Sequence, residues 1–183
     1  YTPTPLYVNT DFPGSESFQK GMAAFASKDW QQAVEELQKH LASQPNSPSA
    51  AYYAGLAHLE LGDFESARES FQQSISISPE FAPGYLGLAR VGLAEEAPES
   101  RIITDLNTAT LLDPGFSEAF LVRASFYLDR ADYDRALQDL EAAEDLAGAR
   151  RRLADADYDL ALTDLQLPDG NGIDLVAEIG ERY

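Results

Sequence analysis

An acidic residue followed by an aromatic one occurs three times in this chain, each time at the same place in a longer pattern. The pairs are Asp29–Trp30, Asp63–Phe64 and Asp132–Tyr133. An alanine follows each aromatic at the third position, and a large apolar residue follows four residues later: Ala33, Ala67 and Ala136, then Leu37, Phe71 and Leu140. Pro45 and Pro79 follow the first two of these segments, and with Pro114 they mark the ends of successive repeats at intervals of 34 and 35 residues. A period of this length predicts a repeat architecture, in which each repeat packs against its neighbours.

Residues 51–79 indicate how one repeat is built. Apolar residues recur at helical spacing on both sides of Gly62 and Asp63. Gly62 suits the left-handed conformation that often follows a helix, and Asp63 can cap the next helix by accepting backbone N–H bonds. Pro79 ends the second helix, because proline has no N–H to donate. Each repeat is therefore predicted to be two helices joined by a tight turn, with Gly21 and Gly55 as small residues that let a neighbouring helix approach.

This pattern closely resembles the tetratricopeptide repeat family over residues 14–148. The resemblance implies an all-α fold, a right-handed superhelical solenoid of four helix-turn-helix repeats. The repeats are expected at about residues 14–47, 48–81, 82–116 and 117–148, and together they would form a domain at 15–148. The third repeat departs from the pattern, because Pro98 stands where the turn aromatic is expected and one extra residue precedes Pro114. Its second helix is expected from about Pro98 to Leu112.

Composition limits the kind of partner. The formal net charge is -18, from 31 acidic and 13 basic residues, which argues against binding to a nucleic acid backbone. A basic or amphipathic partner would be attracted, although the acidity is better explained as a means of keeping a solenoid soluble. No apolar run approaches the ~18 residues of a membrane span, so no membrane insertion is expected. The chain has no cysteine, and its compartment is left open.

The two ends differ from the repeats. Residues 1–14 contain three prolines and no helical period, which is typical of an extended linker or arm, or of an unstructured end. Residues 158–179 resemble part of the receiver domain of bacterial response regulators, in which a strand like YDLALTD ends in a phosphate-accepting aspartate, here Asp164. The acidic pair for Mg²⁺ and the later Ser/Thr and Lys of a receiver are missing, so Asp164 is expected to be inactive.

For residues 149–183 we therefore predict a helical tail. Helices are expected at about 149–165, covering the last repeat, and at 173–181, with Pro168 and residues 170–172 between them. A fusion or recombination product is the other explanation, because ADYD at residues 131–134 recurs at 156–159.

Signatures of common enzymes are not found in the sequence. It has no phosphate-binding glycine-rich loop followed by lysine, no zinc-ligand spacing and no cysteine nucleophile. The two histidines, His40 and His58, stand singly on predicted helices and are assigned structural roles. The chain is accordingly expected to be no enzyme and to hold no cofactor and no metal.

In the family that the repeats resemble, the first helix of each repeat lines a concave groove. The resemblance places eleven residues there: Phe18, Met22, Phe25, Tyr52, Leu56, Leu59, Leu86, Arg90, Leu93, Leu121 and Leu128. Some members of the family carry a Lys/Asn/Arg clamp for a peptide's terminal carboxylate, but the matching positions here hold Phe18, Met22, Tyr53, Pro83 and Gly87. An apolar groove suits a peptide or an amphipathic helix. Alternatively, these side chains pack between repeats or are covered by the chain's own arm or tail.

Three functional hypotheses follow. The leading one is a non-enzymatic scaffold that binds a protein segment in the groove. The second is a phosphorelay protein with Asp164 as phosphoacceptor. The third is a self-associating module, a homo-oligomer in which the arm or tail of one copy enters the groove of another.

Overall fold

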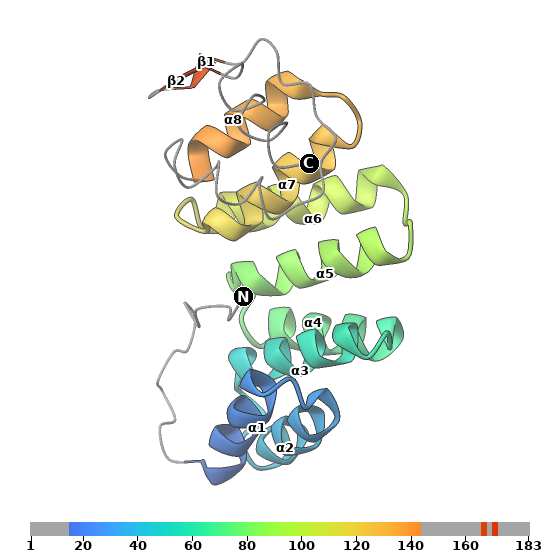
Figure 1. Ribbon diagram of the computed structural model, residues 1–183. Helices are drawn as coiled ribbons and strands as arrows, with labels where there is room; N and C mark the ends of the chain where they lie inside the picture. Colours follow the sequence, from blue (N-terminus) through green and yellow to red (C-terminus); the bar gives the residue numbers. More distant parts are fainter. Residues whose placement is uncertain (1–14, 144–165, 168–169, 172–183) are drawn as a thin grey trace. The chain divides into compact units, whose positions relative to one another are not determined.

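The computed structural model describes residues 15–143, 166–167 and 170–171, and it is almost entirely helical in these ranges (Figure 1). The helices of the described residues are α1 (Glu16–Ala26), α2 (Trp30–Ser43), α3 (Pro48–Glu60), α4 (Phe64–Ile77), α5 (Ala82–Ala94), α6 (Glu99–Leu112), α7 (Ser117–Leu128) and α8 (Tyr133–Ala143). The predicted all-α repeat fold is confirmed. The helix expected from about Pro98 is present as α6.

Two short strands were not anticipated from the sequence. β1 (Gln166–Leu167) and β2 (Gly170–Asn171) pair antiparallel, with Gln166 opposite Asn171. The arm at 1–14, Asp164 and the tail helices expected at 149–165 and 173–181 lie outside the described residues. The division of the chain at residues 14 and 148 therefore stays a prediction.

The chain forms two compact units, which are described separately. The first unit ends at Leu112 and contains three helical hairpins, α1–α2, α3–α4 and α5–α6. The second unit begins at Asp113 and contains the hairpin α7–α8. Within the first unit each hairpin packs against the next, α2 on α3 and α4 on α5. The first helices also pack on one another, α1 on α3 and α3 on α5, more extensively than the second helices do, so this unit curves toward its first helices.

Side-chain caps fix where the helices begin. The carboxylate of Asp29 accepts the N–H of Gln32 at 3.1 Å, and that of Asp63 accepts the N–H of Ser66 at 3.2 Å. Asp63 thus caps α4 as the sequence predicts. Pro48 is the first residue of α3. An N–H at this position would have no partner within the helix, so proline loses no hydrogen bond there.

A left-handed residue ends the first helix of every hairpin. These residues are Lys28 (φ 61°), Gly62 (φ 75°), Glu96 (φ 53°) and Ala131 (φ 56°), at the same position of the repeat. The next residue then donates its N–H back into the helix, as Asp63 does to the carbonyl of His58 at 2.9 Å. Only one of the four is a glycine, so three turns carry a Cβ in a conformation that disfavours it.

The second helix of the third hairpin is offset by one residue. Its buried Ile102 and Leu106 stand one position further from the turn than Ala67 and Phe71 do in α4. The carbonyl of Pro98 accepts the N–H groups of Arg101 and Ile102 at 2.9 and 3.3 Å, so the backbone itself satisfies these two donors at the start of α6. The extra residue before Pro114 is therefore taken up at the beginning of α6.

Phe71 is at the centre of the first unit's core. It is fully buried, and its ring lies against the backbone of both α3 and α5 at glycine positions. A Cβ on Gly55 would lie 2.6 Å from a ring carbon of Phe71, and a Cβ on Gly87 would lie 2.3 Å from one. Leu37 packs against Gly21 in the same way, at 2.8 Å. The expectation that small residues allow close helix approach is confirmed for Gly21 and Gly55.

We predict that Gly87→Ala lowers the free energy of unfolding by about 1–3 kcal/mol, because the added methyl group overpacks a filled core. Phe71→Leu should relieve the clash, so the double variant should lose less stability than the two single losses added together. Urea denaturation of the four proteins, followed by circular dichroism, measures this coupling. Strictly additive losses would show that the methyl group added at position 87 does not clash with the ring of Phe71.

We also predict that Lys28→Gly stabilises the first unit by about 0.5–1 kcal/mol, because glycine adopts the left-handed conformation without the Cβ penalty. Lys28→Ala is the matched control, since it removes the same charge and keeps Cβ, and it should give no such gain. Gly62→Ala should have the opposite sign, because a Cβ there meets nothing within 4 Å and so adds only backbone strain. Thermal denaturation ranks the variants, and an equal effect of glycine and alanine at position 28 would contradict the prediction.

Candidate functional site

The predicted binding residues of the first unit occupy three rows across its first helices. One row holds Phe18, Tyr52 and Leu86, the middle row holds Met22, Leu56 and Arg90, and the third row holds Phe25, Leu59 and Leu93. Each row takes one residue from α1, one from α3 and one from α5, because the hairpins repeat in register. Burial separates these nine residues into two groups.

Three of the nine are part of the core. Phe25, Tyr52 and Leu86 are buried, with exposed fractions of 8%, 6% and 0%. The ring of Phe25 lies 5.1 Å from that of Trp30 and 5.3 Å from that of Tyr53, both edge to face. Contacts of this kind stabilise aromatic cores. For these side chains the structure shows packing within and between hairpins, which the sequence left open as an alternative.

The other six are half-buried and keep part of their side chains in contact with solvent. They include the whole middle row, together with Phe18, Leu59 and Leu93. Phe18, Met22, Leu56 and Leu59 also pack against the buried core from outside. We define the inner face as Met22, Leu56, Leu59, Arg90 and Leu93. Its side chains are apolar except that of Arg90, which carries one positive charge, and the helices that hold them pack on the buried core.

The helices that carry most of the inner face hold few charges. α3 contains one acidic residue, Glu60, and α5 contains one charged residue, Arg90. On α1, Glu16 pairs with Lys20 at 2.8 Å, and this bond lowers the pKa of the Glu16 carboxyl. The inner face is therefore close to neutral, and most of the acidity of the chain lies elsewhere in its sequence.

The remaining two predicted residues belong to the second unit. Leu121 is half-buried and Leu128 is buried, both on α7. Their part in binding stays a prediction.

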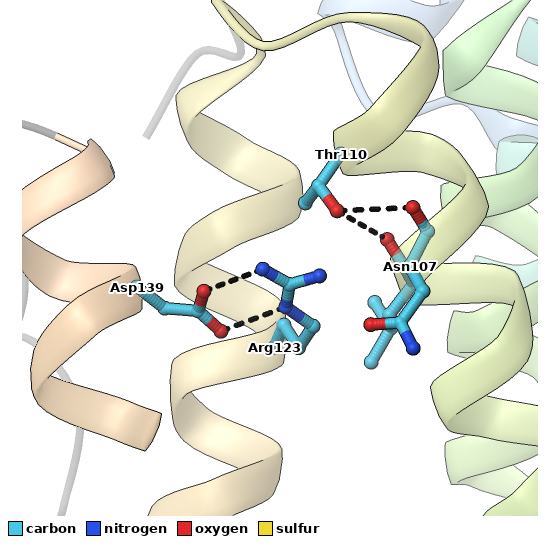
Figure 2. Close-up of polar contacts among 5 residues, drawn as sticks. Asn107, Thr110, Arg123 and Asp139 are labelled. Atoms are coloured by element: carbon cyan, nitrogen blue, oxygen red, sulfur yellow. Dashed lines mark hydrogen bonds and ion pairs between the residues drawn. The ribbon is translucent and has the colours of Figure 1, made fainter. Parts of the chain in front are cut away.

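The second unit also contains an ion pair that the sequence interpretation missed (Figure 2). Arg123 on α7 donates from Nε to Oδ2 of Asp139 at 2.8 Å and from Nη2 to Oδ1 at 2.6 Å. The side chains are only 16% and 6% exposed, and the hydrogen bond to Asp139 raises the pKa of the Arg123 guanidinium. Lys20 and Glu36 hold the same positions in the first hairpin. The recurrence of a basic residue on the first helix and an acidic residue on the second could have predicted the ion pair from the sequence.

We predict that Asp139→Ala destabilises the second unit by about 3 kcal/mol, because it leaves the guanidinium of Arg123 buried without its partner. The double variant Arg123→Leu/Asp139→Leu should recover most of that loss, since it removes both charges and fills the space. Denaturant unfolding reported by hydrogen exchange in α7 and α8 gives both values. A double variant as unstable as Asp139→Ala would show that the pair itself contributes the stability.

Helical hairpins that repeat the same left-handed turn, each with buried residues at matching or nearly matching positions, define a helical-repeat protein. Comparison with known families agrees with this class: residues 18–83 match the family described as tetratricopeptide repeat. That match covers most of the first two hairpins and reaches the start of the third.

Solved structures share the fold over most of the chain. A thermophilic tetratricopeptide repeat protein from Thermus thermophilus aligns with a TM-score of 0.65 and 22% identity, over 76% of this chain and 78% of that one. MamA from Desulfovibrio magneticus RS-1 aligns with a TM-score of 0.58 and 20% identity, over 78% and 76%. The TPR2B domain of yeast Sti1, solved as a complex with pHsp70, aligns with a TM-score of 0.53 and 20% identity, over 67% and 94%.

No curated protein sequence matches this chain. None of the matches given above is to a receiver domain, so the resemblance of residues 158–179 gains no support from them. Within the described ranges, no helix has both the length and the apolar character that crossing a bilayer requires. The same ranges contain no cluster of three or more His, Cys, Asp or Glu side chains able to hold a metal ion.

Proposed function

We propose that this chain is a non-enzymatic protein-interaction module that binds a peptide or an amphipathic helix on the inner face of its first unit. One observation carries the proposal. The middle row of this face is half-buried in all three hairpins, whereas the rows beside it contain core residues. These partly exposed, mainly apolar side chains repeat in a row on stacked hairpins. A second chain that binds there can bury the area that they leave exposed.

The chemistry of the inner face favours an apolar ligand surface. Completing the burial of one leucine side chain contributes up to about 1.5–3 kcal/mol. Leu56, Leu59 and Leu93 each have area left to bury. An amphipathic helix presents apolar residues at steps of three and four, which suits a row of such contacts.

A terminal carboxylate is not the expected anchor. The positions that would form a carboxylate clamp hold apolar residues or glycine, and Gly87 and Pro83 are buried. The Sti1 domain shares the fold and was solved as a complex with pHsp70. That ligand is a property of the Sti1 domain. For this chain we propose the general role of binding a segment of another protein, without a clamp for a terminal carboxylate.

Net charge would affect how fast a partner arrives. At a formal charge of -18 the chain attracts basic segments over a distance set by ionic strength. The proposed partner is therefore a basic amphipathic segment, apolar where it meets the inner face and positively charged elsewhere.

We predict that Leu56→Glu weakens binding at least tenfold, because a carboxylate in the middle row must lose water without a partner. The probe is a fluorescent peptide selected from a displayed library of basic amphipathic helices against the whole chain, and its dissociation constant is measured by fluorescence polarisation. Leu111→Glu is the matched control, since Leu111 is 80% exposed on α6 and lies outside the inner face.

The two variants should have the same helix content by circular dichroism. Equal affinity of both for the selected peptide would contradict binding on the inner face. Light scattering on the wild type, with and without the peptide, tests self-association: a dimer that the peptide dissociates would mean that a second copy occupies this face.

A further inference from the structure

The buried histidine of the first hairpin, His40, joins the end of α2 to the beginning of α1. Its exposed fraction is 1%. Its Nδ1 lies 2.8 Å from the hydroxyl oxygen of Ser15, the residue that caps α1. The same oxygen accepts the N–H of Phe18 at 3.4 Å, and the rings of Phe18 and His40 lie 5.1 Å apart.

The Ser15 hydroxyl can pair with either tautomer of the neutral ring. Its oxygen keeps a second lone pair beside the Phe18 N–H, so it can donate to Nδ1 or accept from it. A neutral imidazole with Nδ1 as acceptor carries its proton on Nε2. That nitrogen is buried and has no hydrogen-bond partner among the residues that the structure describes. The neutral ring therefore fits this site with one polar atom already unsatisfied.

A second proton would not fit the same site. In the doubly protonated ring both nitrogens are donors: Nδ1 can donate to the Ser15 oxygen, and the Nε2–H still has no acceptor among the described residues. The ring would also carry a positive charge in a buried position, which is unfavourable without a paired anion. Burial lowers the pKa of His40, and no charged neighbour contributes to that shift. The carbonyl end of α2 acts in the opposite direction, because it favours a cation.

Charged side chains on the surrounding helices do not replace the missing anion. α1 carries Glu16 and Lys20, α2 carries Glu35, Glu36 and Lys39, and α3 carries His58 and Glu60. Glu16 pairs with Lys20, and Glu35 and Glu36 pair with Lys39. The carboxyl of Glu16 has a lowered pKa, so it stays ionised where histidine titrates.

We propose that His40 is an acid-sensitive latch: protonation places a positive charge in a buried site without a paired anion, and this favours opening of helix α1, which carries Phe18 and Met22. α1 can be released without opening the rest of the first unit, because it is terminal among the described helices and its main packing partners are α2 and α3. Opening α1 would remove Met22 from the inner face. That consequence rests on the proposed function, whereas the opening itself does not.

The sign follows from proton linkage. The opened form has a solvated histidine that titrates near an ordinary value of about 6.5, while the closed form resists the proton. Acid therefore favours the opened form as pH falls through that value. If the closed form stays neutral throughout, the opening equilibrium of α1 should rise about tenfold between pH 7.5 and 5.5.

Hydrogen–deuterium exchange of the full chain tests this, with rates divided by those of an unstructured peptide at each pH. Amides of α1 should show the tenfold rise, and those of α5 should not. His40→Gln should abolish the rise, because the amide still offers Ser15 an acceptor and does not titrate. His58→Gln is the matched control and should keep it, since His58 lies on α3, half-buried beside Asp63 at 3.4 Å.

A rise that survives His40→Gln, or that disappears in His58→Gln, would overturn the proposal, as would constant protection of α1 in the wild type. If His40→Gln does not fold, NMR titration of the wild-type imidazoles decides. His40 must then titrate below the ordinary histidine value of about 6.5 and together with the loss of α1 protection. Independent titration of His40 at an ordinary pH would overturn the latch, and neither result depends on whether a peptide binds.

Discussion

The close contact between one aromatic ring and two glycines is the constraint on which the first unit depends. Phe71 extends from α4 to its own hairpin partner at Gly55 and to the next hairpin at Gly87. The same side chain therefore closes one hairpin and joins it to the next, so packing within and between hairpins cannot vary independently. An isolated hairpin would leave that ring partly exposed, which is why such repeats are stable only when stacked.

Much of the fold could be predicted because its signals are local. Asp29 and Asp63 cap the helices that follow them, and Gly62 has the left-handed conformation that its residue type favours. Residue type did not reveal that Lys28 and Glu96 share this conformation; their position in the repeat could have. In the third hairpin the carbonyl of Pro98 accepts two N–H groups of the first turn of α6. The second helix therefore forms at this place in the repeat although the sequence lacks the aspartate found before α2 and α4.

The candidate site could be predicted only in part, because a register position does not determine burial. Phe18 and Tyr52 are equivalent, yet Phe18 is half-buried and Tyr52 is buried, with its ring packed on Tyr53 and Phe71. Burial depends on neighbours from other hairpins, which one helix of sequence cannot supply. The pair Arg123–Asp139 was missed for a similar reason, since its geometry exists only once two helices are packed.

The outer faces of α1 and α3 differ in burial. In α3, Ala50, Tyr53 and Ala57 are fully or almost fully buried against the preceding hairpin, whereas the equivalent residues of α1 are exposed: Glu16, Gln19 and Ala23. Of the three helices that carry the inner face, α1 has the fewest packing partners among the described elements, chiefly α2 and α3. The first member of the middle row therefore stands on the least packed of these three helices. A buried group beside that helix, such as His40, can alter the face there without disturbing the core around Phe71.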